Sequence, residues 1–326
     1  MRKMADFKAL TPLECALRIL EIENPLVVMH QRPDGDTVGS GAALCRLFLA
    51  LGKKPLYTCA DEIPARLAFL TEGLEFTDNF EGRTAVAIDI ASPSQLGALE
   101  GKITPALMID HHKTGIPFAD FYTVSDSSSA GEVLYTVILE LEKMGKISID
   151  KALAVPLYAS ISSDTGGFIF SSAKESTHIA AARLISLGID SAEINRLLFN
   201  SKSKEQILAE GMTAGEMKTA FDGRVSYAVI TKKMREERAL PFCAFECAID
   251  VVRALENIEI CFVIKETDAG EFKASLRSVG KNVAEIATLH GGGGHVRAAG
   301  CTIKAESIGE AEKILLCELE EAFYGI

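Results

Sequence analysis

The stretch His30-Gln31-Arg32-Pro33-Asp34-Gly35-Asp36 follows the apolar run Pro25–Met29. The run has the length and composition of a buried strand, and Pro33 and Gly35 are residues that form turns. In open sheets of parallel strands, ligands bind at the carboxyl ends of the strands. One histidine and two aspartates at such an end predict a ligand site, although a turn with hydrogen-bonded aspartates would explain this string alone equally well.

Three further strings place ionisable side chains where we expect other apolar strands to end. Asp89 closes the run Thr84–Ile88, Asp110-His111-His112 follows Ala106–Ile109, and Asp164 is interpreted as a fourth case of the same kind. One such residue has an ordinary explanation as a helix cap, but four at the opening of one sheet form a constellation. Clustered carboxylates repel one another unless a cation joins them, so we expect a pair of divalent metal ions.

The types of side chain narrow the choice of metal. Mixed oxygen and imidazole ligands suit Mn²⁺, Co²⁺ or Fe²⁺ better than Ca²⁺, and no thiolate in these strings indicates zinc. Hydrolysis of a phosphate ester is therefore the leading interpretation of the four strings.

The composition is that of a globular protein. Of its 326 residues 48% are hydrophobic and 24% are charged, a length and composition that allow two domains. No apolar run approaches the roughly eighteen residues of a membrane span. Asp6, Lys8 and Glu14 stand where a signal peptide would be apolar, and the eight cysteines form no C-x-x-C pair. These features predict a cytoplasmic protein with reduced cysteines and no membrane partner.

The formal net charge of −11 bears on the kind of substrate. It argues against binding of long duplex nucleic acids through a broad basic surface. Metal ions and a few arginines can still reverse the potential locally, so a small anionic substrate stays open. The charge therefore favours short nucleotides over polymers.

The alternation of strand-like and helix-like segments predicts the fold class. The first 185 or so residues indicate an α/β domain with a largely parallel, doubly wound sheet and helices on both faces. Ser129-Ala130-Gly131-Glu132 resembles a capping box at the start of one helix. The later pattern, with a hairpin across 267–270, indicates a smaller α+β domain. We expect the first domain over 1–186, a helical connector over 187–222 and the second domain over 223–326.

A glycine-rich string, Leu289–Gly300, lies in the second domain. Its glycines Gly291–Gly294 allow the backbone to approach a ligand and to offer amide groups to phosphate oxygens. His295 and Arg297 could add charge-assisted hydrogen bonds. A flexible loop is the plainer explanation of such a run, and Arg277 on a neighbouring predicted strand is a weak signal by itself.

Together these strings resemble the DHH phosphoesterase superfamily over nearly the whole chain. The resemblance is closest to its short-oligonucleotide hydrolases, which are the bacterial nanoRNases that also dephosphorylate 3′-phosphoadenosine 5′-phosphate (pAp), and the related cyclic-di-AMP or pApA phosphodiesterases. It implies an N-terminal DHH domain, a C-terminal DHH-associated domain and an active site in the cleft between them. It also implies two Mn²⁺ sites. His30 and Asp34 would hold one ion, and Asp36, His111 and Asp164 would hold the other. Asp89 would bridge both ions.

The resemblance assigns further roles. Asp110 would orient a ligand histidine, and His112 would contact the scissile phosphate rather than a metal ion. The nucleotide would be held from the second domain by a set of polar and glycine residues: Arg277, Ser278, Gly291, Gly292, Gly293, Gly294, His295 and Arg297. Gln95 is a departure, because relatives often have an arginine near this position.

The activity that the resemblance implies is Mn²⁺-dependent hydrolysis of nanoRNA to mononucleotides and dephosphorylation of pAp, with two metal ions activating a bridging water. A stand-alone cyclic-di-AMP or pApA phosphodiesterase is the alternative in the same class. A non-catalytic nucleotide sensor is the alternative from another class, and it is disfavoured because every expected metal ligand is present. The sequence leaves open the preferred substrate, the polarity of digestion, a homodimer, and Co, Fe or Mg as the native metal.

Overall fold

The computed structural model describes residues 7–113 and 115–324. The chain divides into two compact units, Met1–Ser201 and Lys202–Ile326. Residues 187–222, expected to form one connector, are shared between them. Helix α7 (Ser191–Phe199) lies in the first unit, whereas α8 (Lys204–Gly215) and β6 (Lys218–Ala220) lie in the second.

The described part of the first unit contains a five-stranded sheet with the order β2-β1-β3-β4-β5. Every neighbouring pair in it is parallel, which confirms the predicted α/β class. The strands are three to five residues long, and β1, β3 and β4 are mostly apolar and buried, as expected for parallel strands covered on both faces. Their bounds are Pro25–Val28 (β1), Leu56–Thr58 (β2), Thr84–Ile88 (β3), Leu107–Asp110 (β4) and Asp120–Thr123 (β5).

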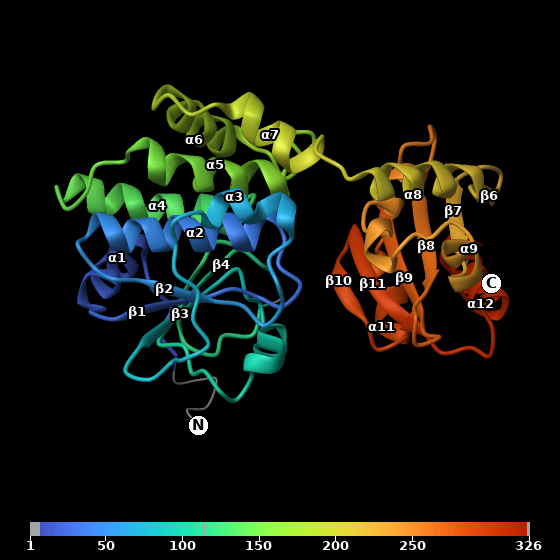
Figure 1. Cartoon of the computed structure of the whole chain (residues 1–326), viewed down its shortest axis with the longest axis horizontal. Helices are drawn as coiled ribbons and strands as arrows, with labels where there is room; N and C mark the ends of the chain where they lie inside the picture. Colours follow the sequence, from blue (N-terminus) through green and yellow to red (C-terminus); the bar gives the residue numbers. More distant parts are fainter. Residues whose placement is uncertain (1–6, 114, 325–326) are drawn as a thin grey trace. The chain divides into compact units, whose positions relative to one another are not determined.

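Helices cover one face of this sheet. Helices α2 and α4 lie over the strands, and α6 and α7 lie farther from them (Figure 1). Val27 of β1 and Met29, which directly follows the strand, pack into a large core with the buried faces of α1, α2, α4 and α5. The helices of this unit are α1 Pro12–Glu21, α2 Gly35–Ala50, α3 Ala68–Thr71, α4 Ala130–Lys143, α5 Lys151–Asp164 and α6 Glu175–Ser186, with a short 3₁₀ helix, η2, at Ala65–Leu67.

The opposite face is covered differently from our expectation. Leu26 and Val28 pack there against a smaller core that includes Leu96 and Leu99 of the 3₁₀ helix η3 (Pro93–Leu99). A regular α-helix does not form in this connection because Gly97 adopts a φ of +56° in its middle. Within the described residues, the helices of this domain are thus concentrated on one face.

The second unit contains a mixed sheet, with six strands among the described residues in the order β10-β11-β9-β8-β7-β6. Only β7 and β8 are parallel, and the predicted hairpin across 267–270 is confirmed as the β8–β9 pair. Helices α11 and α12 cover one face of the sheet, while α8 and α10 cover the other. The remaining bounds are β7 Val225–Ile230, α9 Lys232–Glu236, η4 Phe242–Phe245, α10 Ala248–Arg253, β8 Ile260–Glu266, β9 Phe272–Ser278, α11 Val283–Leu289, β10 Gly293–His295, β11 Ala298–Ile303 and α12 Ile308–Tyr324.

None of the helices in the described ranges combines the length and the apolar character needed to cross a membrane.

The contact between α2 and α5 depends on a glycine. A Cβ atom added to Gly39 would lie 2.7 Å from the backbone nitrogen of Ser160 and 2.8 Å from the carbonyl oxygen of Pro156. Both are backbone atoms, so neither can move away without shifting α5. Gly39 therefore sets how closely the two helices that carry Asp36 and Asp164 approach each other.

We predict that Gly39→Ala lowers the free energy of unfolding of the first unit by about 1–3 kcal/mol, because overpacking at a backbone contact forces the helices apart. Urea denaturation followed by circular dichroism measures the change. Gly211→Ala is the matched control, since Gly211 also lies within a helix but has open space around it. This control is expected to be neutral or stabilising by up to about 1 kcal/mol. Equal effects of the two substitutions would contradict the role assigned to Gly39.

Candidate metal centre

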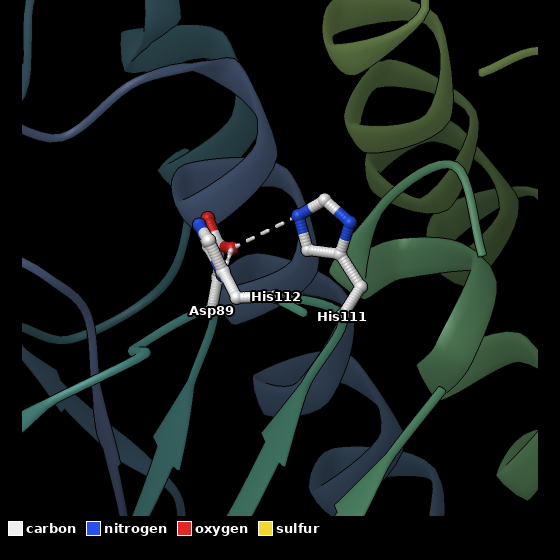
Figure 2. Close-up of side chains that lie close together, drawn as sticks. All are labelled: Asp89, His111 and His112. Carbon is white, nitrogen blue, oxygen red and sulfur yellow. Dashed lines mark ion pairs between the residues drawn. The ribbon is translucent and has the colours of Figure 1, made fainter. Parts of the chain in front are cut away.

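The ionisable residues of the first unit gather at the carboxyl ends of β1, β3 and β4. The strand order reverses between β1 and β3, because β2 lies on one side of β1 and β3 lies on the other. Such a reversal opens a crevice at the ends of the strands. Figure 2 shows Asp89 after β3 beside His111 and His112, which follow β4.

A first cluster consists of His30, Asp34 and Asp89. The Nε2 atom of His30 lies 3.7 Å from Asp34 Oδ1 and 3.4 Å from Asp89 Oδ2. The Nδ1 atom of His30 lies 2.7 Å from the carbonyl oxygen of Gln31, which can only accept, so Nδ1 carries the hydrogen. In the neutral ring this leaves the Nε2 lone pair facing the two carboxylates, as a metal ligand requires.

A second cluster is centred on His111. Its Nε2 atom lies 3.4 Å from Asp164 Oδ2 and 3.6 Å from Asp36 Oδ2. The Oδ1 atom of Asp89 also lies 3.6 Å from it. Atoms bound to one ion at about 2.1 Å are roughly 3.0–3.6 Å apart, so these separations match a set of ligands close to its bound geometry.

Asp89 belongs to both clusters through different oxygens, with Oδ2 toward His30 and Oδ1 toward His111. Its side chain is only 4% exposed. Its backbone has a φ of +58°, a left-handed conformation that is uncommon for residues other than glycine. Strained backbone of this kind persists where the surrounding structure holds it, and it is frequent at functional sites.

Asp36 is held by two other helices. Its Oδ2 accepts a hydrogen bond from the amide of Ala130 at 2.8 Å, and its Oδ1 accepts from the amide of Gly131 at 3.3 Å. The hydroxyl of Ser160 on α5 also donates to Oδ1. The carboxylate thus caps the N-terminus of α4, where the helix dipole favours a negative charge.

The close spacing of these carboxylates and imidazoles shifts several of their pKa values. Burial and repulsion from Asp89 and Asp164 raise the pKa of Asp36 well above its usual range. Burial and repulsion from Asp34 and Asp89 do the same to the pKa of Asp164. Burial lowers the pKa of His30, but Asp34 and Asp89 outweigh it and raise that pKa to about 11. The centre therefore attracts positive charge, and its oxygen and imidazole donors fit divalent metal ions.

Asp110 and His112 form a pair next to Asp89. The Nδ1 atom of His112 lies 3.7 Å from Asp89 Oδ1, and Asp89, His111 and His112 form a third group whose donor atoms could hold an ion. The Nδ1 atom of His112 donates to Asp110 Oδ1 at 2.7 Å, and Asp110 is fully buried. Burial lowers the pKa of His112, but the hydrogen bond and the charge of Asp110 outweigh it and raise the pKa to about 9. His112 is thereby held in one orientation and favoured in its positively charged form.

One placement differs from the sequence analysis. Asp164 does not follow a strand but is the last residue of helix α5. Asp150 caps the start of this helix, and Gly166 and Gly167 follow its end with φ values of +58° and +70°. The segment resembled a buried strand because it is apolar, yet it is a buried helix, and apolar runs of the two kinds are hard to distinguish by pattern.

Comparison with known proteins identifies the two domains of the chain. Residues 24–161 match the DHH family, N-terminal domain, and residues 244–321 match the DHHA1 domain. The chain is 32% identical over 311 residues to the bifunctional oligoribonuclease and PAP phosphatase NrnA of Thermus thermophilus, across 92% of this chain and 91% of that protein. The chain belongs to the DHH phosphoesterase family.

The chain is also similar to two other named proteins and to one solved structure. The NrnA protein of Bacillus subtilis is 29% identical across 92% of this chain and 95% of its own length. The cyclic-di-AMP phosphodiesterase PdeA of Listeria monocytogenes is 26% identical across 94% of this chain but only 49% of that protein. An exopolyphosphatase-related protein from Bacteroides fragilis shares the fold, with a TM-score of 0.86 at 22% identity over 95% of this chain and 96% of that one.

In the DHHA1 region the glycine run is more ordered than a flexible loop. Gly293–His295 form strand β10, which pairs with β11. An added Cβ would lie 2.3 Å from the carbonyl oxygen of Gly300 at Gly292, and 2.4 Å from that of Ala298 at Gly294. The amides of Gly291 and Gly292 donate to carbonyls of α11 at 3.0 and 2.9 Å, so these two amides are engaged within the fold. Close packing of two strands explains part of the glycine requirement.

The other predicted nucleotide-binding residues of this unit have mixed environments. Arg277 donates to the carbonyl of Leu276 at 2.9 Å, and burial lowers the pKa of its guanidinium. Ser278 donates to the carbonyl of Lys281 at 2.5 Å, and Arg297 is exposed. The side chain of His295 lies outside the described part of the structure.

Several supporting residues were not found by sequence reasoning. Ser129 caps α4 as expected, but the Glu132 carboxylate does not complete the capping box and instead accepts from the backbone and hydroxyl of Ser128. It also accepts from Ser176 and Thr177 of α6, so it anchors the segment whose amides hold Asp36. No local pattern reveals this, because the partners lie more than forty positions away.

Gln95, near the position where relatives often have an arginine, makes two hydrogen bonds. Its Oε1 accepts from the amide of Ala91 at 2.5 Å, and its carbonyl accepts from the amide of Gln31 at 2.7 Å. It therefore joins the loop after Asp89 to the loop after His30. This is a supporting role that needs no positive charge.

We predict that the protein binds two Mn²⁺ ions per chain, that Asp34→Ala retains one tightly bound ion, and that Asp89→Ala loses tight binding of both. Asp89 faces His30 of the first cluster with one oxygen and His111 of the second with the other, whereas Asp34 belongs to the first cluster. Isothermal titration of metal-stripped protein with Mn²⁺ gives the stoichiometry of each variant. Asp78→Ala removes an exposed carboxylate outside the clusters and should bind like the wild type. Wild-type binding by a folded Asp89→Ala variant would refute the shared ligand.

Proposed function

We propose that this phosphate-ester hydrolase cleaves short oligoribonucleotides to mononucleotides and removes the 3′-phosphate of pAp. The observation that carries the proposal is the shared Asp89 carboxylate, with one oxygen toward each of two His–Asp clusters. Two adjacent cation sites with one common ligand are the arrangement used for in-line displacement at phosphorus. The NrnA names of the Thermus thermophilus and Bacillus subtilis relatives support the choice of substrates.

We propose Mn²⁺ for both sites, held by His30, Asp34 and Asp89 in one and by Asp36, His111 and Asp164 with Asp89 in the other. The mixture of imidazole and carboxylate donors supports this choice, and Co, Fe and Mg remain alternatives. When bound, the ions would supply Lewis-acid activation of water and neutralise charge on the phosphate.

The protein's own residues would do the rest. Asp110 holds His112 protonated and oriented, so its ring can bind a phosphate oxygen or protonate the leaving group. Asp36 stays in place because the amides of α4 and the hydroxyl of Ser160 hold it. In the DHHA1 region the proposed nucleotide contacts are Arg277, Ser278, Gly291–Gly294, His295 and Arg297.

A stand-alone cyclic-di-AMP or pApA phosphodiesterase is the second candidate, favoured by the 94% coverage of this chain in the match to Listeria monocytogenes PdeA. The chain spans about half of that relative, so the likeness concerns the shared domains only. A nucleotide sensor without catalysis is less favoured, because both ligand clusters are complete. We further propose a cytoplasmic location and small nucleotides rather than long duplexes as partners.

We predict that metal-stripped protein does not hydrolyse pApA and that added Mn²⁺ restores release of AMP, since the clustered carboxylates need cations to bind an anionic substrate. Chromatographic separation of the products measures the reaction, and Asp89→Ala is expected to be inactive under the same conditions. The parallel assay with pAp separates the two proposed activities. Absence of cleavage of both substrates by folded, Mn²⁺-loaded protein would contradict the proposed function and favour the sensor.

A further inference from the structure

A pocket of about 310 Å³ lies in the first unit, at the carboxyl end of β2. Strand β2 is the sheet neighbour of β1 and is parallel to it, so the pocket lies at the same edge of the sheet as the metal clusters. Its volume suits one small ring system rather than a whole oligonucleotide. It is lined by Tyr57, Cys59, Ala60, Asp61, Glu62, Ile63 and Phe76.

Two hydrogen bonds join this pocket to the loop that carries the first cluster. The thiol of Cys59 donates to the carbonyl oxygen of His30 at 3.1 Å. A carboxylate oxygen of Asp61 accepts from the amide of Arg32 at 2.7 Å, where the backbone of Arg32 has a φ of +54°. Two residues that line the pocket are thus bonded to the backbone of the loop that carries His30 and Asp34.

The apolar part of the pocket includes an aromatic surface. Phe76 is 52% exposed, which is unusual for a phenylalanine, whereas Tyr57 is 9% exposed. The ring of Tyr57 meets the ring of Phe76 edge-on, with 5.7 Å between their centroids. The backbone of residues 75–77 is fixed to β2 by hydrogen bonds between Tyr57 and Glu75 and between Thr77 and Tyr57. An exposed ring on a fixed backbone is suited to stacking with a planar ligand.

The polar part of the pocket is acidic. Asp61 and Glu62 line it, and an ionised carboxylate accepts hydrogen bonds but cannot donate them. Two carboxylates repel a phosphate group and favour an uncharged ring that carries N–H groups. Adenine, guanine and cytosine have exocyclic amino groups, whereas uracil presents two carbonyl oxygens around a single N–H.

We propose that this pocket binds one nucleobase of the substrate, stacked on Phe76, and that Asp61 and Glu62 favour bases with an amino group over uracil. The proposal rests on the proposed function, because it needs a nucleotide substrate at the metal clusters. It adds a specificity site on the DHH domain itself, formed by the strand next to the first ligand loop.

The test is a double-mutant cycle between Phe76 and the base. Wild type and Phe76→Ala are compared on the dinucleotide pApA and on two analogues in which one or the other adenosine is replaced by an abasic ribose. We expect Phe76→Ala to lower kcat/KM for pApA roughly 5- to 150-fold, the range of base–aromatic stacking. For one of the two abasic analogues the loss should largely disappear, because the partner of the ring is already absent. Phe76→Trp should restore most of the activity on pApA.

Leu49→Ala is the matched control, since Leu49 is a similarly exposed apolar side chain (47%) on α2 and does not line the pocket. Losses from Phe76→Ala that are the same on pApA and on both abasic analogues would overturn the proposal, as would a loss of Mn²⁺ affinity that explains them. Absence of pApA hydrolysis by the wild type would instead count against the proposed function, so the two failures are distinguishable.

The preference among bases is tested with Glu62→Gln. The wild type is expected to favour pApA over pUpU, and the variant to reduce that ratio, because an amide both donates and accepts. If neither Glu62→Gln nor Asp61→Asn changes the ratio of pApA to pUpU hydrolysis, the proposed contribution of the two carboxylates is contradicted. The stacking on Phe76 is tested independently of this outcome.

Discussion

The carboxylate of Asp36 joins three helices at the centre of the first domain. It comes from the first turn of α2, accepts two amides at the start of α4, and receives the hydroxyl of Ser160 from α5. The Oδ2 atom of Asp36 lies 3.6 Å from His111 Nε2. The two side chains would therefore be able to hold the same metal ion. The helix-terminal amides and the Ser160 hydroxyl offset part of the cost of burying this carboxylate, although burial and repulsion still raise its pKa. These hydrogen bonds hold together the helices that support the rest of the centre.

The cost of burying carboxylates also explains why those of this centre are held in fixed positions. Four carboxylates gather at the carboxyl ends of the strands, those of Asp34, Asp36, Asp89 and Asp164. Burial and mutual repulsion raise the pKa of Asp36 and of Asp164. Repelling groups separate unless the fold holds them, and three of these four carboxylates are fixed in different ways. Asp34 caps α2, Asp89 is held in a left-handed conformation, and Asp36 caps α4. The rigidity keeps the ligands close to the spacing that a metal requires.

Sequence reasoning reached the fold class and the first-domain ligand candidates because both depend on local patterns. Apolar runs ending in His30, Asp89 and Asp110 mark strand ends, and parallel strands bring such ends together. It placed Asp164 at the end of a strand rather than of a helix, since an apolar run does not distinguish a buried helix from a buried strand, although Asp164 does lie in the second cluster. It also missed Glu132 and Ser160, whose partners are distant in sequence. The glycine run was interpreted by composition, whereas strand packing at Gly292 and Gly294 depends on a neighbour that the sequence does not identify.

The environment of the first ligand loop connects metal binding with choice of substrate. Cys59 and Asp61 bond to the backbone of the loop that carries His30, and Gln95 bonds to the same loop from the side of Asp89. A base bound against Phe76 would therefore contact a surface whose residues Cys59 and Asp61 also hold the loop of the first cluster. Since this surface is acidic, it disfavours a phosphate, whereas the metal clusters require one. Neighbouring surfaces of opposite preference would orient a nucleotide with its phosphate at the ions and its base toward β2.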